Sequence, residues 1–243
     1  MWSIAKRELR FYFSNITGYL FILFYFTINT LLLWFLDTPF LLFSTGLADL
    51  SPFFEISPWL FVFLIPAISM RSFSEERSTG TLELLLTKPI NPFEIYLGKF
   101  LGIAIVLIIT ILPTTINILG LVTLLQPNSN LDLGNIFASY LALILLSILF
   151  LNISLCISIL FKNQITSFLV AFLICFIQYF FWNFIANVSS LPSTYILISN
   201  LGIQAHYLNL IHGLLKLEDM IYFLGLDIAI FILGIELIKK EQA

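Results

Sequence analysis

Long uncharged apolar runs dominate the chain, and their length predicts helices that cross a membrane. Residues 11–36, 100–125 and 136–161 contain no Asp, Glu, Lys or Arg. A helix rises about 1.5 Å per residue, so roughly 20 apolar residues cross a hydrocarbon core about 30 Å thick. Apolar and polar residues do not alternate along these runs, as they would in a transmembrane β-barrel. The pattern therefore predicts an all-α integral membrane protein.

Six membrane spans fit this pattern, and we predict them at 16–36, 56–70, 100–125, 136–161, 165–187 and 220–238. The second span is short, because only 15 residues separate Glu55 from Arg71, unless it extends until Glu55 lies among the lipid headgroups. Pro58 is placed to start this helix and Pro66 to kink it. We treat residues 1–243 as a single transmembrane domain.

Residues 163–215 carry no formal charge over 53 positions, and two interpretations fit them. Two full spans broken at SSLPS would account for the length. The second half, however, contains five polar side chains whose transfer into hydrocarbon is costly: Asn200, Gln204, His206, Asn209 and His212. We therefore predict interfacial or re-entrant helices on the outer face at 189–219, before the last span.

Composition and charge fit a membrane protein with both termini in the cytosol. The chain is 60% hydrophobic and 10% charged, with a mean hydropathy of +1.03, whereas soluble domains are about 25% charged. With six spans and both ends inside, ten of the eleven Lys and Arg residues lie on the cytosolic side and only Lys216 lies outside, as the positive-inside rule requires. A seven-span arrangement would place Lys239 and Lys240 outside.

The first 15 residues, MWSIAKRELRFYFSN, mix aromatic and aliphatic side chains with Lys6, Arg7 and Arg10. This combination is typical of an amphipathic helix that lies on an anionic membrane surface. We predict such an interfacial helix at 1–15; a flexible basic leader is the alternative.

The stretch at 71–99, RSFSEERSTGTLELLLTKPINPFEIYLGK, contains eight of the chain's 25 charged residues and lies between the second and third predicted spans. Thr79 or Thr81 is a candidate helix N-cap, and Glu83 falls in the first turn, where the helix dipole favours an acid. Four leucines supply an apolar side: Leu82, Leu84, Leu85 and Leu86. We predict a short cytosolic helix that docks on a partner through leucines and charges; a solvated connector is the alternative.

These residues resemble a known family. The segment SEERSTGTLELLLTKPI is similar to the cytosolic loop of type-2 ABC transporter (ABC-2) permeases, in which the pattern E-E-R-x-x-G-T-L-E-x-L-L-x-x-P includes the coupling helix that meets the ATP-binding subunit. The segment GLLKLEDMIYFLGLDIAIF at 213–231 resembles the entry to that family's sixth span. The resemblance covers essentially the whole chain. It is greatest to the gliding-motility-associated permease of Bacteroidetes, with the permease for nitrous-oxide reductase maturation as a near relative.

The resemblance implies a permease of the bacterial inner membrane that pairs with a second permease, identical or not, and with a separate cytosolic ATPase. It assigns contact with the ATPase to the motif residues Glu75, Glu76, Arg77, Gly80, Thr81, Leu82 and Glu83. The sequence contains no G-x-x-x-x-G-K-[ST] phosphate-binding motif, so we expect the partner to bind ATP and Mg²⁺ and this chain to need no cofactor and hold no catalytic residue. The expected role is substrate export or mechanical work, and gliding motility is one process that such mechanical work would serve. No nucleic-acid partner is expected.

Three further residues, His206, His212 and Asp227, form a second candidate site in the membrane or at its outer face. An acid inside a span is a functional candidate by default, although Asp227 could also be an interfacial acid near Glu218 and Asp219. The two histidines are six residues apart, on different faces of a helix, so no metal site is expected. Two rival functions remain: an intramembrane lipid-modifying enzyme, and a channel or secondary transporter without an ATPase, for which the intramembrane polar content is thin.

Overall fold

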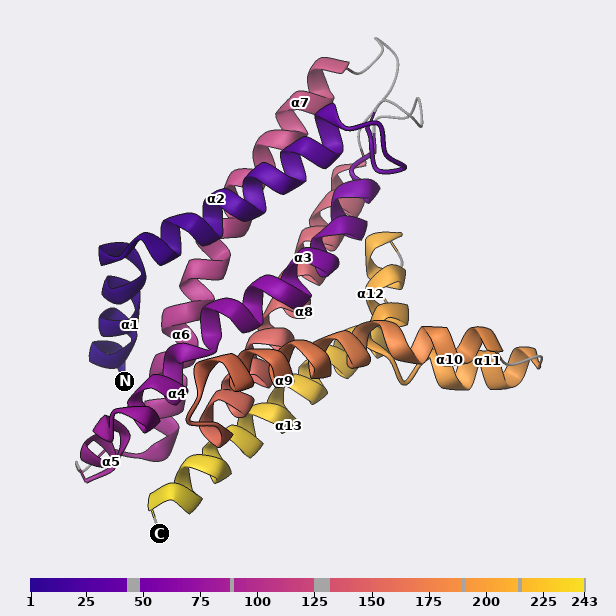
Figure 1. The fold of residues 1–243 in the computed structure, drawn as a ribbon. Coiled ribbons are helices and arrows are strands. Elements are labelled where there is room, and N and C mark those ends of the chain that lie inside the picture. The colour runs from indigo at the N-terminus through magenta and orange to yellow at the C-terminus, as the bar shows by residue number, and fades with distance from the viewer. Residues whose placement is uncertain (43–48, 88–89, 125–131, 189–190, 214–215, 243) are drawn as a thin grey trace.

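The computed structural model describes residues 1–42, 49–87, 90–124, 132–188, 191–213 and 216–242, and every regular element in these ranges is a helix. In chain order the elements are α1 Trp2–Ser14, α2 Ile16–Thr30, η1 Leu31–Phe35, α3 Ser51–Ser69, α4 Arg71–Ser78, α5 Thr81–Leu86, α6 Pro92–Ile111, η2 Leu112–Thr115, α7 Ile116–Leu124, α8 Leu133–Leu160, α9 Gln164–Phe176, η3 Ile177–Phe181, α10 Trp182–Val188, α11 Pro192–Ser199, α12 Ile203–Ile211 and α13 Leu217–Gln242. Both termini and α5 lie at the same end of the helix bundle (Figure 1).

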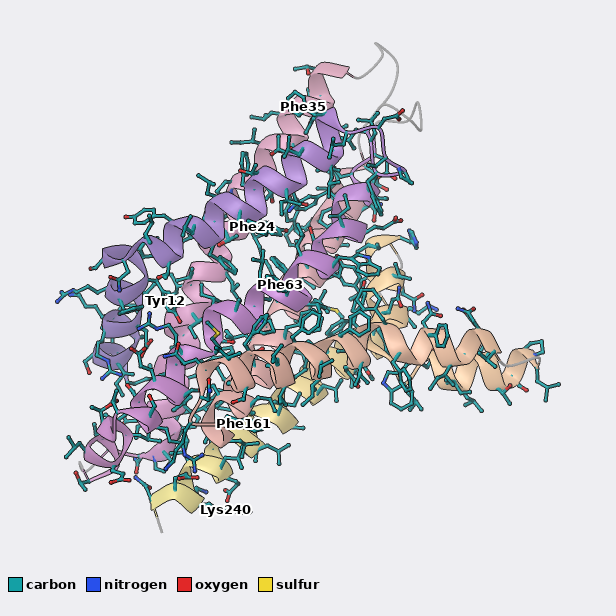
Figure 2. The ribbon with its side chains drawn as sticks, in the orientation of Figure 1. Tyr12, Phe24, Phe35, Phe63, Phe161 and Lys240 are labelled. Atoms are coloured by element: carbon teal, nitrogen blue, oxygen red, sulfur yellow. The ribbon has the colours of Figure 1, made fainter. Side chains whose placement is uncertain are left out.

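Among the described residues, six helical stretches are long and apolar enough to cross a membrane, which confirms the predicted all-α membrane fold. They are Ile16–Phe35, Ser51–Ser78, Pro92–Thr123, Leu133–Leu160, Gln164–Val188 and Leu217–Gln242. Figure 2 labels Phe35 at one end of the bundle and Phe161 and Lys240 at the other, so successive stretches run in alternating directions. Six alternating stretches bring the two termini to one end.

The second and third spanning helices both begin earlier than their apolar runs, which for the second is the longer of the two forms left open above; Pro58 lies inside that helix and does not start it as predicted. The second stretch begins at Ser51, so Glu55 lies inside α3 with its side chain exposed. The third begins at Pro92, so Lys99 lies within α6, where it is fully buried. A charged residue ends an apolar run in the sequence but need not end a helix: Glu55 is exposed, and Lys99 is buried against the carboxylates of Glu8 and Glu76.

A backbone carbonyl left without its helical donor by a proline in α3 forms a hydrogen bond with α12. Pro58 has no N–H to donate to the carbonyl of Phe54, four residues earlier. The hydroxyl of Tyr207 on α12 donates to that oxygen instead, at 2.7 Å. Tyr207 is completely buried, so the contact fixes α12 against the start of α3 inside the bundle.

We expect Tyr207→Phe to lower stability by about 1–3 kcal/mol, because the Phe54 carbonyl would be left buried without a donor. The measurement is thermal unfolding of the purified chain in detergent. Tyr195→Phe, on the more exposed helix α11, is the matched control and should leave the unfolding temperature unchanged. Equal effects of the two variants would contradict the role given to Tyr207.

The region predicted as interfacial or re-entrant contains two short helices in place of a seventh full span. Helix α11 packs beside α10, and its Leu197 side chain is exposed. Helix α12 packs against α8 and buries Ile203, Leu210 and Ile211. In Figure 1, α10 and α11 extend together from one side of the bundle, while α12 turns back beside α8. The location of this region at the outer face stays a prediction.

Helix α1 packs along the first turns of α6 at two glycines. A Cβ atom at Gly98 would lie 2.8 Å from the Cβ of Ile4, and one at Gly102 would lie 2.6 Å from the Cβ of Glu8. Both separations are shorter than carbon atoms tolerate, so the close approach of the two helices requires glycine. Burial raises the pKa of Tyr12 on α1, whose protonated hydroxyl donates to the Ile68 carbonyl at 2.8 Å. Helix α1 is therefore built into the bundle on one face.

Candidate functional site

The motif at 75–83 forms a bend between α4 and α5, which we name the α4–α5 elbow and define as residues 71–86. Helix α4 continues the line of α3 and ends at Ser78. Gly80 follows with a φ of 71°, a left-handed conformation that glycine adopts without steric cost, and it is the N-cap of α5. The predicted caps are wrong, because Thr81 is the first helical residue and the Thr79 hydroxyl donates to the Glu75 carbonyl. Glu83 does lie in the first turn.

On the side of α4 that faces the helix bundle, Glu76 joins Arg7, Glu8 and Lys99 in a group of four charged residues. We name this group the four-charge cluster. One carboxylate oxygen of Glu76 accepts a hydrogen bond from Arg7 at 2.5 Å, and the other lies 2.9 Å from Nζ of Lys99. Nζ also lies 3.3 Å from Oε1 of Glu8 and donates to the Ser72 carbonyl. Two acids and two bases thus neutralise one another where α1, α4 and α6 meet.

In the four-charge cluster, Arg7 is partly and Lys99 fully removed from water. Partial burial of Arg7 acts to lower its pKa, but the neighbouring carboxylates of Glu76 and Glu8 outweigh that effect and raise the pKa overall. Lys99 has no exposed surface, and its ammonium also lies 4.6 Å from the centre of the Phe73 ring. Both cations therefore bind α4 firmly to the elements on either side of it.

Arg77 and Ser74 fasten α4 to the ends of two further membrane helices. Arg77 donates to the Ile159 carbonyl at 2.5 Å and lies 2.9 Å from the Glu241 carboxylate. The Ser74 hydroxyl donates to the Ser158 carbonyl at 3.1 Å. These contacts join α4 to the last turn of α8 and to the end of α13. Together with the four-charge cluster, they connect α4 directly to α1, α6, α8 and α13.

The side of the elbow that faces away from the helix bundle carries exposed side chains on α5. Leu84 is 67% exposed and Leu82 only 4%, so the leucines of α5 do not form one apolar side as predicted. Leu82 belongs to the core, whereas Leu84 points away from the chain beside the exposed Thr81 and Glu83. The Leu86 side chain and residues 88–89, where the helix was predicted to end, lie outside the described residues.

A cleft of about 320 Å³ lies between α1 and α4, and it reaches Thr81 at the start of α5. Its walls carry both signs of charge, from Arg7, Glu8, Glu75 and Glu76 among others. Glu75 pairs with Arg71 one helical turn away, at 2.7 Å. The charged residues that line the cleft are three acids and two bases, Glu8, Glu75, Glu76, Arg7 and Arg71, so the cleft is polar and has a formal excess of one negative charge.

The structure divides the seven predicted coupling residues between two faces. Glu76, Arg77 and Leu82 contact the chain itself, and Gly80 forms the bend. The residues with exposed or half-exposed side chains are Glu75, Thr81 and Glu83. Contact of any of them with an ATPase stays a prediction. Glu8 and Lys99, which attach the inner face of α4 to α1 and α6, were not predicted from the sequence. The signal that could have revealed Glu8 is its position on the same side of α1 as Ile4 and Tyr12, because an acid on the apolar side of a helix needs a partner.

The second candidate site is not one site, because the structure keeps its three residues apart. Nδ1 of His206 lies 2.5 Å from Asp219, and its ring stacks on Tyr222 with centroids 3.9 Å apart. His212 is exposed just after α12. Asp227 lies eight residues beyond Asp219 on α13, about 12 Å along the helix. The three residues therefore share no common pocket with one another.

Asp227 belongs to a buried polar chain inside the bundle. The Asn152 side-chain amide donates to Asp227 at 2.9 Å, and the Tyr96 hydroxyl donates to Oδ1 of Asn152 at 3.3 Å. The Tyr96 ring occupies the space beside Gly234, where a Cβ would lie 2.3 Å from it. The chain connects α13, α8 and α6, and Asp227 is buried among these helices. Within the described residues, no group of three potential metal ligands exists.

We expect His206→Ala to loosen α12 while the spans stay folded, because His206 connects α12 to the first turn of α13. Loss of a hydrogen bond to a charged group lowers the opening free energy by about 1.5–3 kcal/mol, which speeds exchange roughly 10- to 100-fold. Hydrogen–deuterium exchange of residues 200–211 measures this change. The control is His212→Ala, whose exposed side chain makes no hydrogen bond within the described part of the chain. If both variants exchange alike, His206 does not hold α12.

Comparison with known proteins identifies the family. A family model described as ABC-2 family transporter protein matches residues 47–238, which include the whole α4–α5 elbow. The chain belongs to the ABC-2 transporter family. The ABC-2 chain is therefore a multi-pass membrane protein and a permease subunit of an ABC transporter; such subunits are not catalytic and generally work with a cytosolic ABC ATPase. No curated protein matches the chain significantly.

The matched region starts after the first two helices of the ABC-2 chain. The four-charge cluster spans this boundary, because Arg7 and Glu8 precede residue 47 whereas Glu76 and Lys99 follow it. Helix α1 is thus attached by ion pairs to the part of the chain that carries the family's pattern.

Proposed function

We propose that the exposed face of α5 receives mechanical force from a separate cytosolic ATPase and that α4 transmits it into the membrane helices. The observation that carries this proposal is the two-sided elbow. Leu84, Glu83 and Thr81 are available on one side, and the other side is joined by charged contacts to four helices. A force on α5 therefore displaces α4 together with the ends of these helices, as in a rigid-body transition.

The end of the bundle that holds the elbow is cytosolic in this proposal, as are both termini. Among the described residues, most Lys and Arg side chains lie at that end, whereas Lys216 precedes α13 at the other. This distribution follows the positive-inside rule. The membrane would be the bacterial inner membrane, and ATP and Mg²⁺ would be bound by the ATPase.

The complete transporter would contain two permease chains, identical or different, above two ATPases. Substrate export and mechanical work in gliding motility are both compatible with such an assembly, and the motility role rests only on the sequence resemblance. A lipid-modifying enzyme has less support, because His206, His212 and Asp227 do not converge. A channel without an ATPase also has less support, because the family model that matches the chain is that of an ABC transporter protein.

Purification of the tagged chain from its native membrane in mild detergent, followed by mass spectrometry, tests the proposal. We expect a P-loop ATPase in stoichiometric amount, and a second six-span chain if the pair is heteromeric. Purification of the chain alone from several mild detergents that preserve its fold would contradict the assignment of an ATPase partner.

A further inference from the structure

Helix α1 has a second face that the bundle does not use. Its inner face buries Ala5, Glu8 and Tyr12, and Ala5 and Glu8 lie against Gly102 of α6. On the opposite side, Trp2, Lys6 and Arg10 follow one another at intervals of four residues, so they form one stripe along the helix. We name these three residues the lateral stripe of α1. Trp2 is 62% exposed, and Lys6 and Arg10 are exposed as well.

The two cations of the lateral stripe are free, unlike the neighbouring Arg7. Arg7 lies at the edge of this face and pairs with Glu76 and Glu8. Within the described part of the chain, neither Lys6 nor Arg10 makes an ion pair or a side-chain hydrogen bond. Two unpaired positive charges one helical turn apart therefore face away from the protein.

The depth of α1 in the membrane follows from its connections. Asn15 is the only residue between α1 and α2, so the helix cannot move away from the start of the first membrane span. The glycine contacts place α1 beside residues 98–102 of α6, within the third spanning stretch. The stripe therefore lies at the membrane boundary, and α2, which follows directly, exposes the apolar side chains Ile16, Leu20 and Leu23.

We propose that the lateral stripe binds the headgroups of anionic phospholipids. Lys6 and Arg10 would bind the phosphate groups, and Trp2 would lie at the headgroup level, where indole rings are enriched. An acidic protein surface is a poorer fit, because α1 leads directly into α2, a membrane-spanning helix with exposed apolar side chains. The inference does not depend on the coupling role proposed for the elbow.

The test uses the full chain in nanodiscs of phosphatidylcholine that contain increasing fractions of phosphatidylglycerol. Native mass spectrometry after release counts the phosphatidylglycerol molecules retained per chain. We expect Lys6→Gln with Arg10→Gln to weaken phosphatidylglycerol retention about 30-fold, from the usual contribution of two cations at an anionic surface. The matched control, Lys162→Gln with Lys240→Gln, also removes two exposed cations outside the stripe and should retain the lipid like the unaltered chain.

Three results would overturn the inference. The first is unchanged retention in the Lys6/Arg10 variant, and the second is an equal loss in the control variant. The third is loss of a copurifying protein with lipid retention intact, which would make the stripe a protein-docking surface. Thermal unfolding in phosphatidylcholine alone should be the same for all variants, because no residue changed makes an internal contact; a stripe variant that unfolds there would contradict the exposed placement of Lys6 and Arg10.

Discussion

Leu84→Asp should abolish stimulation of the partner ATPase while leaving the membrane bundle folded. Leu84 is the most exposed apolar side chain among the elbow residues whose side chains the structure describes, and the polar residues Thr81 and Glu83 on the same helix are exposed as well. An apolar anchor of this kind typically contributes at least about 2 kcal/mol to a docking contact, and an introduced charge adds the cost of its own desolvation. We therefore expect partner affinity to fall at least 30-fold.

The measurement is ATP hydrolysis by the reconstituted complex, together with copurification of the ATPase. Leu133→Asp is the matched control, because Leu133 is 65% exposed but lies at the opposite end of the bundle, in the first turn of α8. An acid there is favoured by the helix dipole. The control should hydrolyse ATP normally. If the complexes with Leu84→Asp and Leu133→Asp both hydrolyse ATP as fast as the unaltered complex, α5 does not take part in the coupling contact.

Lys99→Met should destabilise the chain by about 3–5 kcal/mol, the usual effect of removing one partner from a buried ion pair. The substitution preserves most of the side-chain volume but leaves Glu76 without the partner at its second oxygen and Glu8 with Arg7 alone. Unfolding in detergent and the yield of folded protein both report the change. Lys162→Met, at an exposed position, is the control and should be neutral.

A second substitution distinguishes loss of charge balance from loss of packing. Lys99→Met combined with Glu76→Met leaves one acid and one base, Glu8 and Arg7, which already lie 3.3 Å apart. We expect the double variant to recover at least half of the lost stability, since no unpaired charge remains buried. If the double variant is as unstable as Lys99→Met alone, the two residues are not energetically coupled.

The spans could be predicted from the sequence because a helix that crosses the hydrocarbon core needs about 20 consecutive apolar residues. The run at 136–161 therefore differs little from the helix Leu133–Leu160. Boundaries at charged residues could not be predicted in the same way. Lys99 follows Gly98 and precedes Gly102, and these glycines bring α1 close enough to supply Glu8 as a partner. That partner lies 91 positions away in the sequence.

The motif of the elbow was found from the sequence, but the direction of its side chains was not. Glu75 and Glu76 are adjacent in the sequence, yet the Glu75 side chain is 44% exposed and that of Glu76, which pairs with Lys99, only 17%. Which of two neighbouring residues faces inward depends on the helices packed around α4. For the same reason Leu82 and Leu84 appear equivalent in the sequence and differ completely in exposure.

Site-specific photo-crosslinking from α5 in intact membranes would test the coupling proposal most directly. A photoreactive amino acid is placed at position 84 in one variant and at position 76 in another, so that one probe faces outward and the other faces the four-charge cluster. We predict an adduct with a cytosolic ATPase from position 84, and an adduct only within the chain from position 76. The absence of any ATPase adduct at position 84, in membranes where the permease is folded and the ATPase is present, would contradict the proposed coupling face.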